Sequence, residues 1–325
     1  MFTTVPLPPH DGTDPGRTVS AIAEWARSEP LAALVDRFGG RLPDGIDTDS
    51  LLDRLDRFSA EHWDFRGGAE RSQAVRRDFP GRTAELVIAA ARALGLVVSA
   101  PPRHRAYRHL LVLGGLAGAC RDRTRHAARL IADGVRVDTV SMLGGFRPLT
   151  PAETDLPGLA DCRYEIDVMA LAARDCFPAT APEHITGSGD PTTGPNTAER
   201  VTGYPAADTA VHVVAAPSRD PRHRRANTAD TCRYWAEQVV APEPGDTVLV
   251  VTSQIYVPFQ HCDAVTDIGL RYRCAIETVG VAAAGPPRPD RCLQEIRSAI
   301  RSMRRLHRTA SGSAVMTGRD DGTTG

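Results

Sequence analysis

The fold is decided by the stretch HLLVLGG (residues 109–115), which continues along the chain to RHAARLIADG (residues 125–134). The apolar run stops at two glycines, and a segment with the apolar spacing of a helix follows and ends at Gly134, a residue suited to a helix C-cap. Continuous apolarity from Leu110 to Leu113 suits a strand that is covered on both faces, as in a parallel sheet between helices. The stretch therefore predicts a strand, a tight turn and a helix.

Segments further along the chain repeat this alternation. Strands are expected at residues 135–143, 210–216, 247–253 and about 273–279, and helices at 162–174, 227–239, 258–268 and 291–306. Strands that alternate with helices predict an α/β fold, a Rossmann-like doubly wound and mainly parallel five-stranded sheet. Ligands of such sheets bind beyond the carboxyl ends of the strands. The loops that follow the strands are therefore the candidate site.

The rest of the chain divides into segments of different composition. Residues 1–100 are expected to form a helical N-terminal extension that ends at Pro101-Pro102, and residues 101–308 the α/β domain. Within that domain, residues 177–207 are crowded with Pro, Gly, Thr, Ser and Asp, which is typical of a functional lid or a disordered insertion. Residues 309–325 are expected to be a flexible polar tail.

Composition excludes several classes of function. The chain has no lysine, which rules out lysine Schiff bases and a lysine-bound pyridoxal cofactor. Its 39 basic and 40 acidic residues give a net charge of −1, so no global field favours nucleic acid or an anionic membrane. The seven cysteines include no C-x-x-C pair and the histidines no H-E-x-x-H motif, so no metal site is expected. Without a signal peptide or a long apolar segment, the chain is expected to be cytoplasmic.

The first candidate site is the turn at Gly114 and Gly115, with Arg121 in the helix that follows. Small residues after a strand let backbone N–H groups approach an anion, and the helix N-terminus adds a favourable dipole. The turn lacks the G-x-G-x-x-G pattern and the lysine of a P-loop. A tight turn without a ligand explains the glycines equally well.

Gly144 and Gly145 repeat this device after the second predicted strand, and Arg147 follows them. The arginine fork would hold a carboxylate or a phosphate, although an arginine on a solvated loop is the alternative. Glu165 opens the next helix, where it is either a general base or hydroxyl acceptor, or an acid favoured by the helix dipole.

Two later loops complete the set of candidates. Asn227 and Thr228 follow a basic loop and predict a phosphate site or an ordinary helix cap. Thr252 and Ser253 could donate to an anion, and Tyr256 or His261 could transfer a proton. His261 could equally lie on a helix surface.

A separate basic face is expected on the last helix. It comprises Arg297, Arg301, Arg304, Arg305 and Arg308. Such a face is usually solvated, and binding of RNA or of an acidic partner is the alternative.

Several of these motifs resemble the bacterial YdcF/SanA/ElyC-like family over residues 105–282. The resemblance rests on LGG (113–115), GG (144–145), YE (164–165), NTAD (227–230) and VTS (251–253) through Pro258. It implies a Rossmann-like α/β domain whose polar pocket at the strand ends binds a nucleotide-like, S-adenosylmethionine-like or phosphorylated ligand. Members usually carry a serine where this chain has Leu143, and Glu-Asn where it has Asp230 and Thr231.

The chain also departs from that family in its expected acid–base pair. Members typically carry histidine and arginine at the positions of Tyr256 and Phe259. Either the chemistry has changed, or Tyr256 and His261 have taken it over.

The sequence leads to two functional hypotheses. The first is a cytoplasmic transferase or hydrolase of actinobacterial specialised metabolism that acts on a small anionic metabolite, phosphorylated or nucleotide-like. In it the glycine pairs, Arg121 and Arg147 hold the anion, while Glu165 and Asn227 orient a polar group. The second is a non-catalytic sensor that binds a nucleotide or S-adenosylmethionine. Neither hypothesis calls for a metal, a membrane or a nucleic acid as partner. The sequence leaves the cofactor unknown, with S-adenosylmethionine or none as the alternatives.

Overall fold

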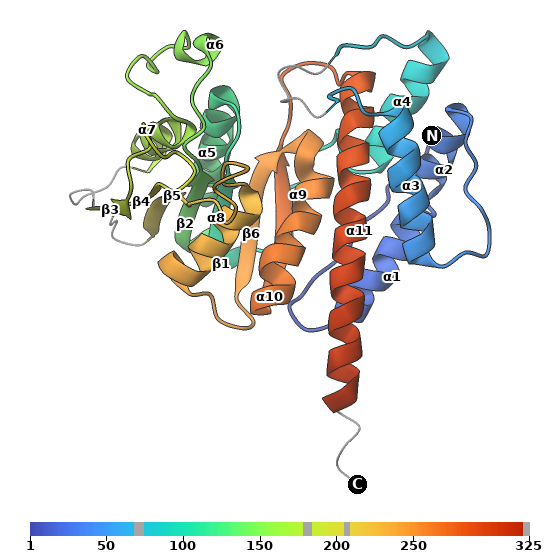
Figure 1. The fold of residues 1–325 in the computed structure, drawn as a ribbon. Coiled ribbons are helices and arrows are strands. Elements are labelled where there is room, and N and C mark those ends of the chain that lie inside the picture. Colours follow the sequence, from blue (N-terminus) through green and yellow to red (C-terminus); the bar gives the residue numbers. More distant parts are fainter. Residues whose placement is uncertain (68–74, 178–183, 205–208, 321–325) are drawn as a thin grey trace. The chain divides into compact units, whose positions relative to one another are not determined.

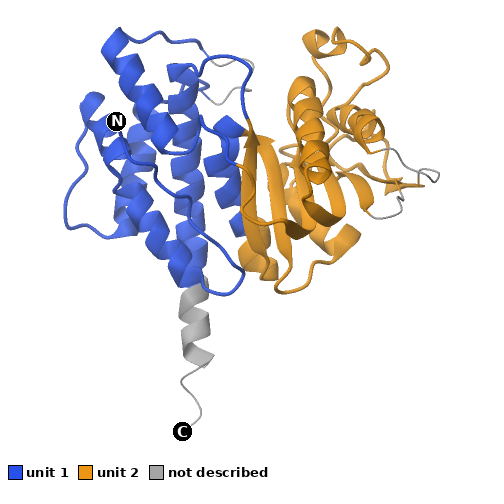
Figure 2. Ribbon diagram, turned by 180° about the vertical axis from the view of Figure 1, so that it is seen from behind, with its two compact units in different colours: residues 1–100, 254–266, 282–325 blue, residues 101–253, 267–281 orange. Residues whose placement is uncertain are grey.

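A computed structural model describes residues 1–67, 75–177, 184–204 and 209–320 (Figure 1). The chain forms two compact units that are each assembled from separate segments (Figure 2). Unit 1 comprises residues 1–100, 254–266 and 282–325, and unit 2 comprises residues 101–253 and 267–281. The chain therefore passes from one unit to the other several times.

Unit 2 is built on one mixed sheet of seven strands in the order β3-β4-β5-β2-β1-β6-β7. The strands are β1 (Ala106–Leu113), β2 (Arg136–Gly144), β3 (His184–Ser188), β4 (Glu199–Tyr204), β5 (Ala210–Ala215), β6 (Thr247–Ser253) and β7 (Ala275–Val281). Strands β5, β2, β1, β6 and β7 pair in parallel, whereas β3 and β4 are antiparallel to their neighbours. The carboxyl ends of the parallel strands therefore meet at one edge of the sheet.

Apolar side chains on both faces explain why the central strands are buried. Leu110 and Val112 of β1 belong to a core that α5 (Ala117–Ala132) and α7 (Glu165–Cys176) complete on one face. His109 points to the opposite face, because successive strand residues alternate. There its ring meets Trp235 edge-on, with the centroids 5.4 Å apart.

The remaining helices of unit 2 are short. They are α6 (Pro151–Thr154), α8 (Thr228–Tyr234), the π-helix η2 (Trp235–Val240) and α10 (Leu270–Tyr272). A second π-helix, η4 (Val265–Gly269), lies where the chain passes between the two units.

Unit 1 is helical. Its elements are α1 (Pro15–Ala26), α2 (Glu29–Arg37), α3 (Thr48–His62), α4 (Gly81–Ala93), η3 (Gln254–Tyr256), α9 (Val257–Ala264) and α11 (Pro289–Asp320). Helix α11 packs against α1, α3, α4 and α9. Aspartates cap two of the helices: Asp14 accepts from the Gly16 amide at α1, and Asp47 from the Ser50 amide at α3. The α11 side chains Leu293, Ile296, Ile300, Met303 and Leu306 are fully buried.

The structure confirms the α/β class and corrects three expectations of the sequence. The sheet has seven strands rather than five, because residues 184–204, which the sequence predicts to be part of a long loop, contain the β3–β4 pair. The other parts of the expected 177–207 loop, residues 178–183 and 205–207, lie outside the described residues. The tail expected from residue 309 is in part helical, since α11 continues to Asp320. Finally, the expected domain of residues 101–308 does not correspond to one unit, because α9 and α11 belong to the same compact unit as residues 1–100.

None of the helices that the structure describes is both long enough and apolar enough to cross a membrane.

Candidate functional site

The turn at Gly114 and Gly115 follows β1 directly and is closely packed. The Gly114 amide donates to the carbonyl oxygen of Leu143 at 2.8 Å. A Cβ atom at position 114 would lie 2.7 Å from that same oxygen and would collide with Oε1 of Glu165. Only glycine therefore fits at this position without movement of its neighbours. The amides of Gly115 and Gly118 have no hydrogen-bond acceptor among the described residues.

Arg123 of α5 joins the carboxyl ends of β1 and β6. Its side chain is buried at 1% exposure, and Nη1 donates to the Leu113 carbonyl at 2.7 Å while Nη2 donates to Ser253 Oγ at 3.0 Å. Its guanidinium also lies within 3.6 Å of where a Cβ of Gly115 would stand. The turn is thus flanked by a carboxyl group on one side and a guanidinium on the other.

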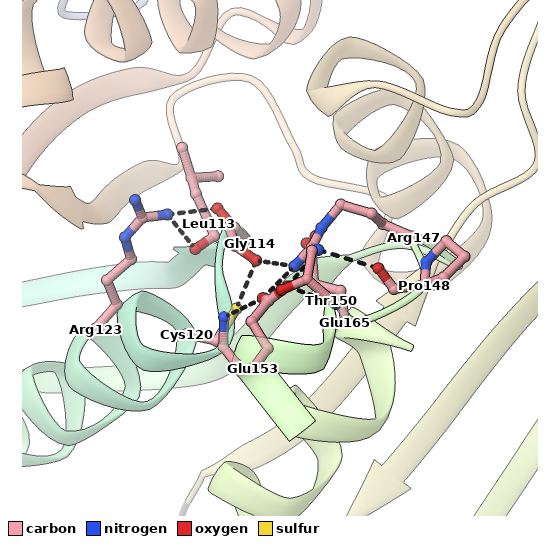
Figure 3. A network of polar contacts seen from close by, with 11 residues as sticks. Leu113, Gly114, Cys120, Arg123, Arg147, Pro148, Thr150, Glu153 and Glu165 are labelled. Carbon is pink, nitrogen blue, oxygen red and sulfur yellow. Dashed lines mark hydrogen bonds and ion pairs between the residues drawn. The ribbon is translucent and has the colours of Figure 1, made fainter. Parts of the chain in front are cut away.

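Arg147 connects the two glycine loops through a network of charged hydrogen bonds (Figure 3). Nη2 and Nη1 donate to Glu153 at 2.8 and 2.9 Å, and Nε donates to Glu165 Oε2 at 3.1 Å. Nη2 also reaches the carbonyl of Gly115 at 3.0 Å. The alternative of a solvated loop arginine therefore does not describe Arg147, whose side chain is only 19% exposed.

The carboxylate of Glu153 accepts hydrogen bonds from an unusually large number of donors. Besides Arg147, the hydroxyl and the amide of Thr150 donate to Oε2, and the Ala117 amide donates to Oε1 at 2.8 Å. Burial alone would raise the pKa of Glu153, but these hydrogen bonds outweigh burial and lower the pKa to about 2. The first amide of α5 therefore donates to a carboxylate of the protein itself. From the sequence, we predicted that an external anion would accept hydrogen bonds at this helix N-terminus.

Glu165 shares Arg147 with Glu153 but is held differently. Burial raises the pKa of Glu165, and the charge of Arg147 opposes that effect without cancelling it. Among the described residues, only Arg147 donates to this carboxyl group, through Oε2. Oε1 faces the Gly114 turn. Glu165 is therefore a carboxyl group with a raised pKa and one oxygen available for a hydrogen bond.

The second glycine pair positions α7 and leaves few donors for a ligand. A Cβ on Gly144 would lie 2.8 Å from Met169 Sδ, so this glycine allows the helix to approach β2. The amide of Glu165 donates to the Arg147 carbonyl at 2.9 Å, and that of Ile166 donates to the Gly145 carbonyl at 3.1 Å. The first amides of α7 are thus already paired.

The other candidate residues of unit 2 have contacts of their own, and not all of them join the glycine turn. Arg121 donates to the Pro157 carbonyl at 2.9 Å and not to the glycine turn. Asn227 caps α8, because its Oδ1 accepts from the Asp230 amide at 3.0 Å, and Thr228 beside it is exposed. Thr252 is buried, whereas Ser253 accepts from Arg123. The site gathers Gly114, Gly115, Arg147, Glu165 and Ser253 from the predicted set.

Tyr256 and His261 belong to unit 1. The Tyr256 hydroxyl accepts from Nη2 of Arg291 at 2.7 Å. His261 is buried, and Nε2 hydrogen-bonds the Pro8 carbonyl at 2.8 Å. Both side chains thus have hydrogen-bond partners within the helical unit, and neither is part of the network around Arg147.

Sequence reasoning missed Arg123 and Glu153. Arg123 lies on the apolar stripe of its helix with Cys120, Ala127 and Leu130, and an arginine in such a stripe requires buried partners. The spacing of Thr150 and Glu153 is that of a capping box, which the structure contains. Both signals were present in the sequence.

Groups of three or more histidine, cysteine, aspartate or glutamate side chains able to hold a metal ion do not occur among the described residues.

Comparisons with known proteins give relatives in mycobacteria. Residues 9–95 match the family described as Rv3785 N-terminal domain. The chain is 29% identical to "Uncharacterized protein Rv3785" of Mycobacterium tuberculosis (strain ATCC 25618 / H37Rv) over 328 residues, which covers 90% of each chain. "Uncharacterized protein Mb3814" of Mycobacterium bovis is similar to the same extent. No solved structure matches the chain. The matched domain falls within the first segment of unit 1.

Proposed function

We propose that unit 2 is a Rossmann-like domain that binds a small anionic metabolite, phosphorylated or nucleotide-like, and transfers a proton with Glu165. The observation that carries the proposal is the state of this carboxyl group. Its side chain is 12% exposed, its pKa is raised, and Oε1 faces a turn whose Gly115 amide has no acceptor among the described residues. A raised pKa brings a carboxyl group closer to the pH at which it can both give and accept a proton, which favours general acid–base catalysis.

Strand order supports this place for the site. Along the chain the parallel strands are β1, β2, β5, β6 and β7, and in the sheet they follow the order β5-β2-β1-β6-β7. The order reverses at β1, and in doubly wound sheets ligands bind beyond the carboxyl ends at such a point. Gly114 and Ser253 lie there, joined through Arg123.

Charge supports an anionic ligand. The open amides of Gly115 and Gly118 lie at the N-terminal end of α5, where the helix dipole favours negative charge. Arg123 adds a positive charge beside Gly115. An anionic group placed there would lie next to Oε1 of Glu165, which in its protonated form can donate to it.

The test begins with a thermal-shift screen of phosphorylated metabolites, nucleotides and S-adenosylmethionine on the full chain, followed by mass spectrometry of each ligand found. An enzyme consumes its ligand. In that case Glu165→Gln should keep binding and lose turnover, whereas Asp175→Asn, which removes an exposed carboxylate from the same helix, should leave both unchanged. Full turnover by Glu165→Gln, or a screen without any ligand, would contradict the proposal.

The second candidate function is a sensor of a nucleotide or of S-adenosylmethionine. It is favoured by the absence of histidine from the described hydrogen bonds at this site. A ligand that binds and is recovered unchanged would select this function over the enzyme.

A further inference from the structure

Unit 1 contains a groove of its own along α11, with a cavity volume of about 530 Å³. Its lining includes the guanidinium groups of Arg301, Arg304, Arg305 and Arg308 and the hydroxyl groups of Ser298 and Ser302. Positions 301, 304, 305 and 308 share one helical face, because residues three and four apart are neighbours on a helix. The volume falls within the range of pockets that hold small molecules.

Two of the four arginines are fixed by aspartates of α3. Arg304 forms ion pairs with Asp53 and with Asp56, the latter at 2.7 Å. Arg308 reaches Asp49 at 2.8 Å and Asp53 at 2.9 Å. These contacts hold both guanidinium groups in place, so little side-chain entropy would be lost when a ligand binds.

The other two arginines differ in their contacts. Arg301 is exposed and has no hydrogen bond or ion pair within the described part of the chain. Arg305 pairs with Asp263, with Nη1 lying 3.9 Å from Oδ1. The lining has four arginines and two aspartates, and Asp49 and Asp53 of α3 pair with Arg308 and Arg304 beside it, so Arg301 is the guanidinium group that offers uncompensated charge to a ligand.

We propose that this groove binds a small molecule that carries two or more linked phosphoryl groups. The planar guanidinium fork of arginine matches phosphate oxygens in pairs, and arginine keeps its charge at any physiological pH. A cavity of limited volume fits a compact oligophosphate. A nucleic-acid strand would instead need an extended basic track, and a protein with a net charge of −1 offers no long-range attraction for it.

The proposal is tested by isothermal titration calorimetry of the full chain with inorganic pyrophosphate and tripolyphosphate at physiological salt. We expect saturable binding with a stoichiometry of one, weakened about tenfold by Arg301→Ala, since the loss of a charged hydrogen bond is of that size. Arg92→Ala, which removes an exposed arginine of α4 in the same unit, is the matched control and should bind like the wild type. Thermal melting of each variant checks that it is folded.

Three outcomes would overturn the proposal: no saturable binding of either probe, equal weakening by Arg92→Ala and Arg301→Ala, or binding of a single-stranded RNA that is tighter than that of tripolyphosphate and is lost in Arg301→Ala. The last outcome would make the groove part of a polymer-binding surface. The groove and the site of unit 2 are distinguished by Arg301→Ala, which should weaken tripolyphosphate binding but leave binding and turnover of the ligand of unit 2 unchanged.

Discussion

At the scale of the residue, Gly114 shows how closely the site of unit 2 is packed. A methyl group at this position would collide with Glu165 Oε1 and approach the Leu143 carbonyl to 2.7 Å. We therefore predict that Gly114→Ala lowers the free energy of unfolding by about 1–3 kcal/mol, the usual cost of overpacking. Urea denaturation followed by circular dichroism measures this change.

Gly145→Ala is the control for Gly114→Ala. This glycine follows the neighbouring strand, and a Cβ atom there would meet nothing within 4 Å. The free energy of unfolding should change by less than about 0.5 kcal/mol. Equal destabilisation by both substitutions would show that close packing at position 114 is not the cause.

Glu153 should make stability depend on pH in the acid range. Its pKa falls from 4.5 in the unfolded chain to about 2 in the folded protein, so it stabilises the fold above pH 4.5. This contribution is lost as the pH falls from 4.5 towards 2. Glu153→Gln should therefore lower the free energy of unfolding at pH 7 by about 3 kcal/mol, and the difference from the wild type should shrink across that window. Urea titrations at several pH values measure it.

Glu165 should show the opposite trend, since its pKa is raised above 4.5. Its protonated form stabilises the folded protein at low pH, and this contribution disappears as the pH rises through the raised pKa. Wild-type stability should thus fall relative to that of Glu165→Gln as the pH rises above 4.5. A difference that is constant with pH would contradict the raised pKa.

The residues of the site were only partly predictable from the sequence. Glycine pairs after apolar strands and an acid at a helix start have local signatures, so Gly114 and Glu165 could be identified. Whether a charged group is buried depends on which loops meet in space. Arg123 and Glu153 have local signals, but their partners, which lie up to 130 residues away along the chain, could not be identified from them.

At the scale of the element, α8 depends on its first residue. Asn227 and Asp230 form a reciprocal capping box. Asn227→Ala should lower the free energy of unfolding by about 1 kcal/mol, while Asn227→Asp should retain most of the cap. Thermal melting of both variants measures the difference. If the alanine variant is as stable as the wild type but loses ligand binding, Asn227 acts in the site and not as a cap.

Strands were predictable where burial on both faces left a continuous apolar run, as in β1 and β6. The β3–β4 pair carries no such pattern, because all five residues of β3 are exposed. This pair forms by hydrogen bonding to the free edge of β5, a backbone interaction that any sequence without proline can make. These two strands therefore lack the apolar pattern from which the other strands were predicted.

At the scale of the whole molecule, a boundary at Pro101 separates the first segment of unit 1 from the sheet, but α11 belongs to unit 1 as well. Sequence patterns show that a helix has an apolar face, and they do not show which partner covers it. The expected domain of residues 101–308 therefore included a helix that packs against α1, α3 and α4.

A fragment of residues 101–308 should not be a stable domain. It would retain α11 up to residue 308 but lack α1, α3 and α4, which exposes side chains such as Leu293, Ile296 and Ile300 that are fully buried in the complete chain. We predict that the fragment binds the dye ANS and aggregates, as followed by fluorescence and size-exclusion chromatography. A monomeric fragment that unfolds cooperatively would contradict the importance of these contacts.

The late position of α11 also constrains how the protein is made in the cell. During synthesis, α1 to α4 leave the ribosome roughly 200 residues before the helix that completes their core, which at about 5–20 residues per second is a delay of about 10–40 seconds. The nascent helical segment must wait that long with part of its apolar surface uncovered, and is therefore exposed to aggregation until α11 has been made.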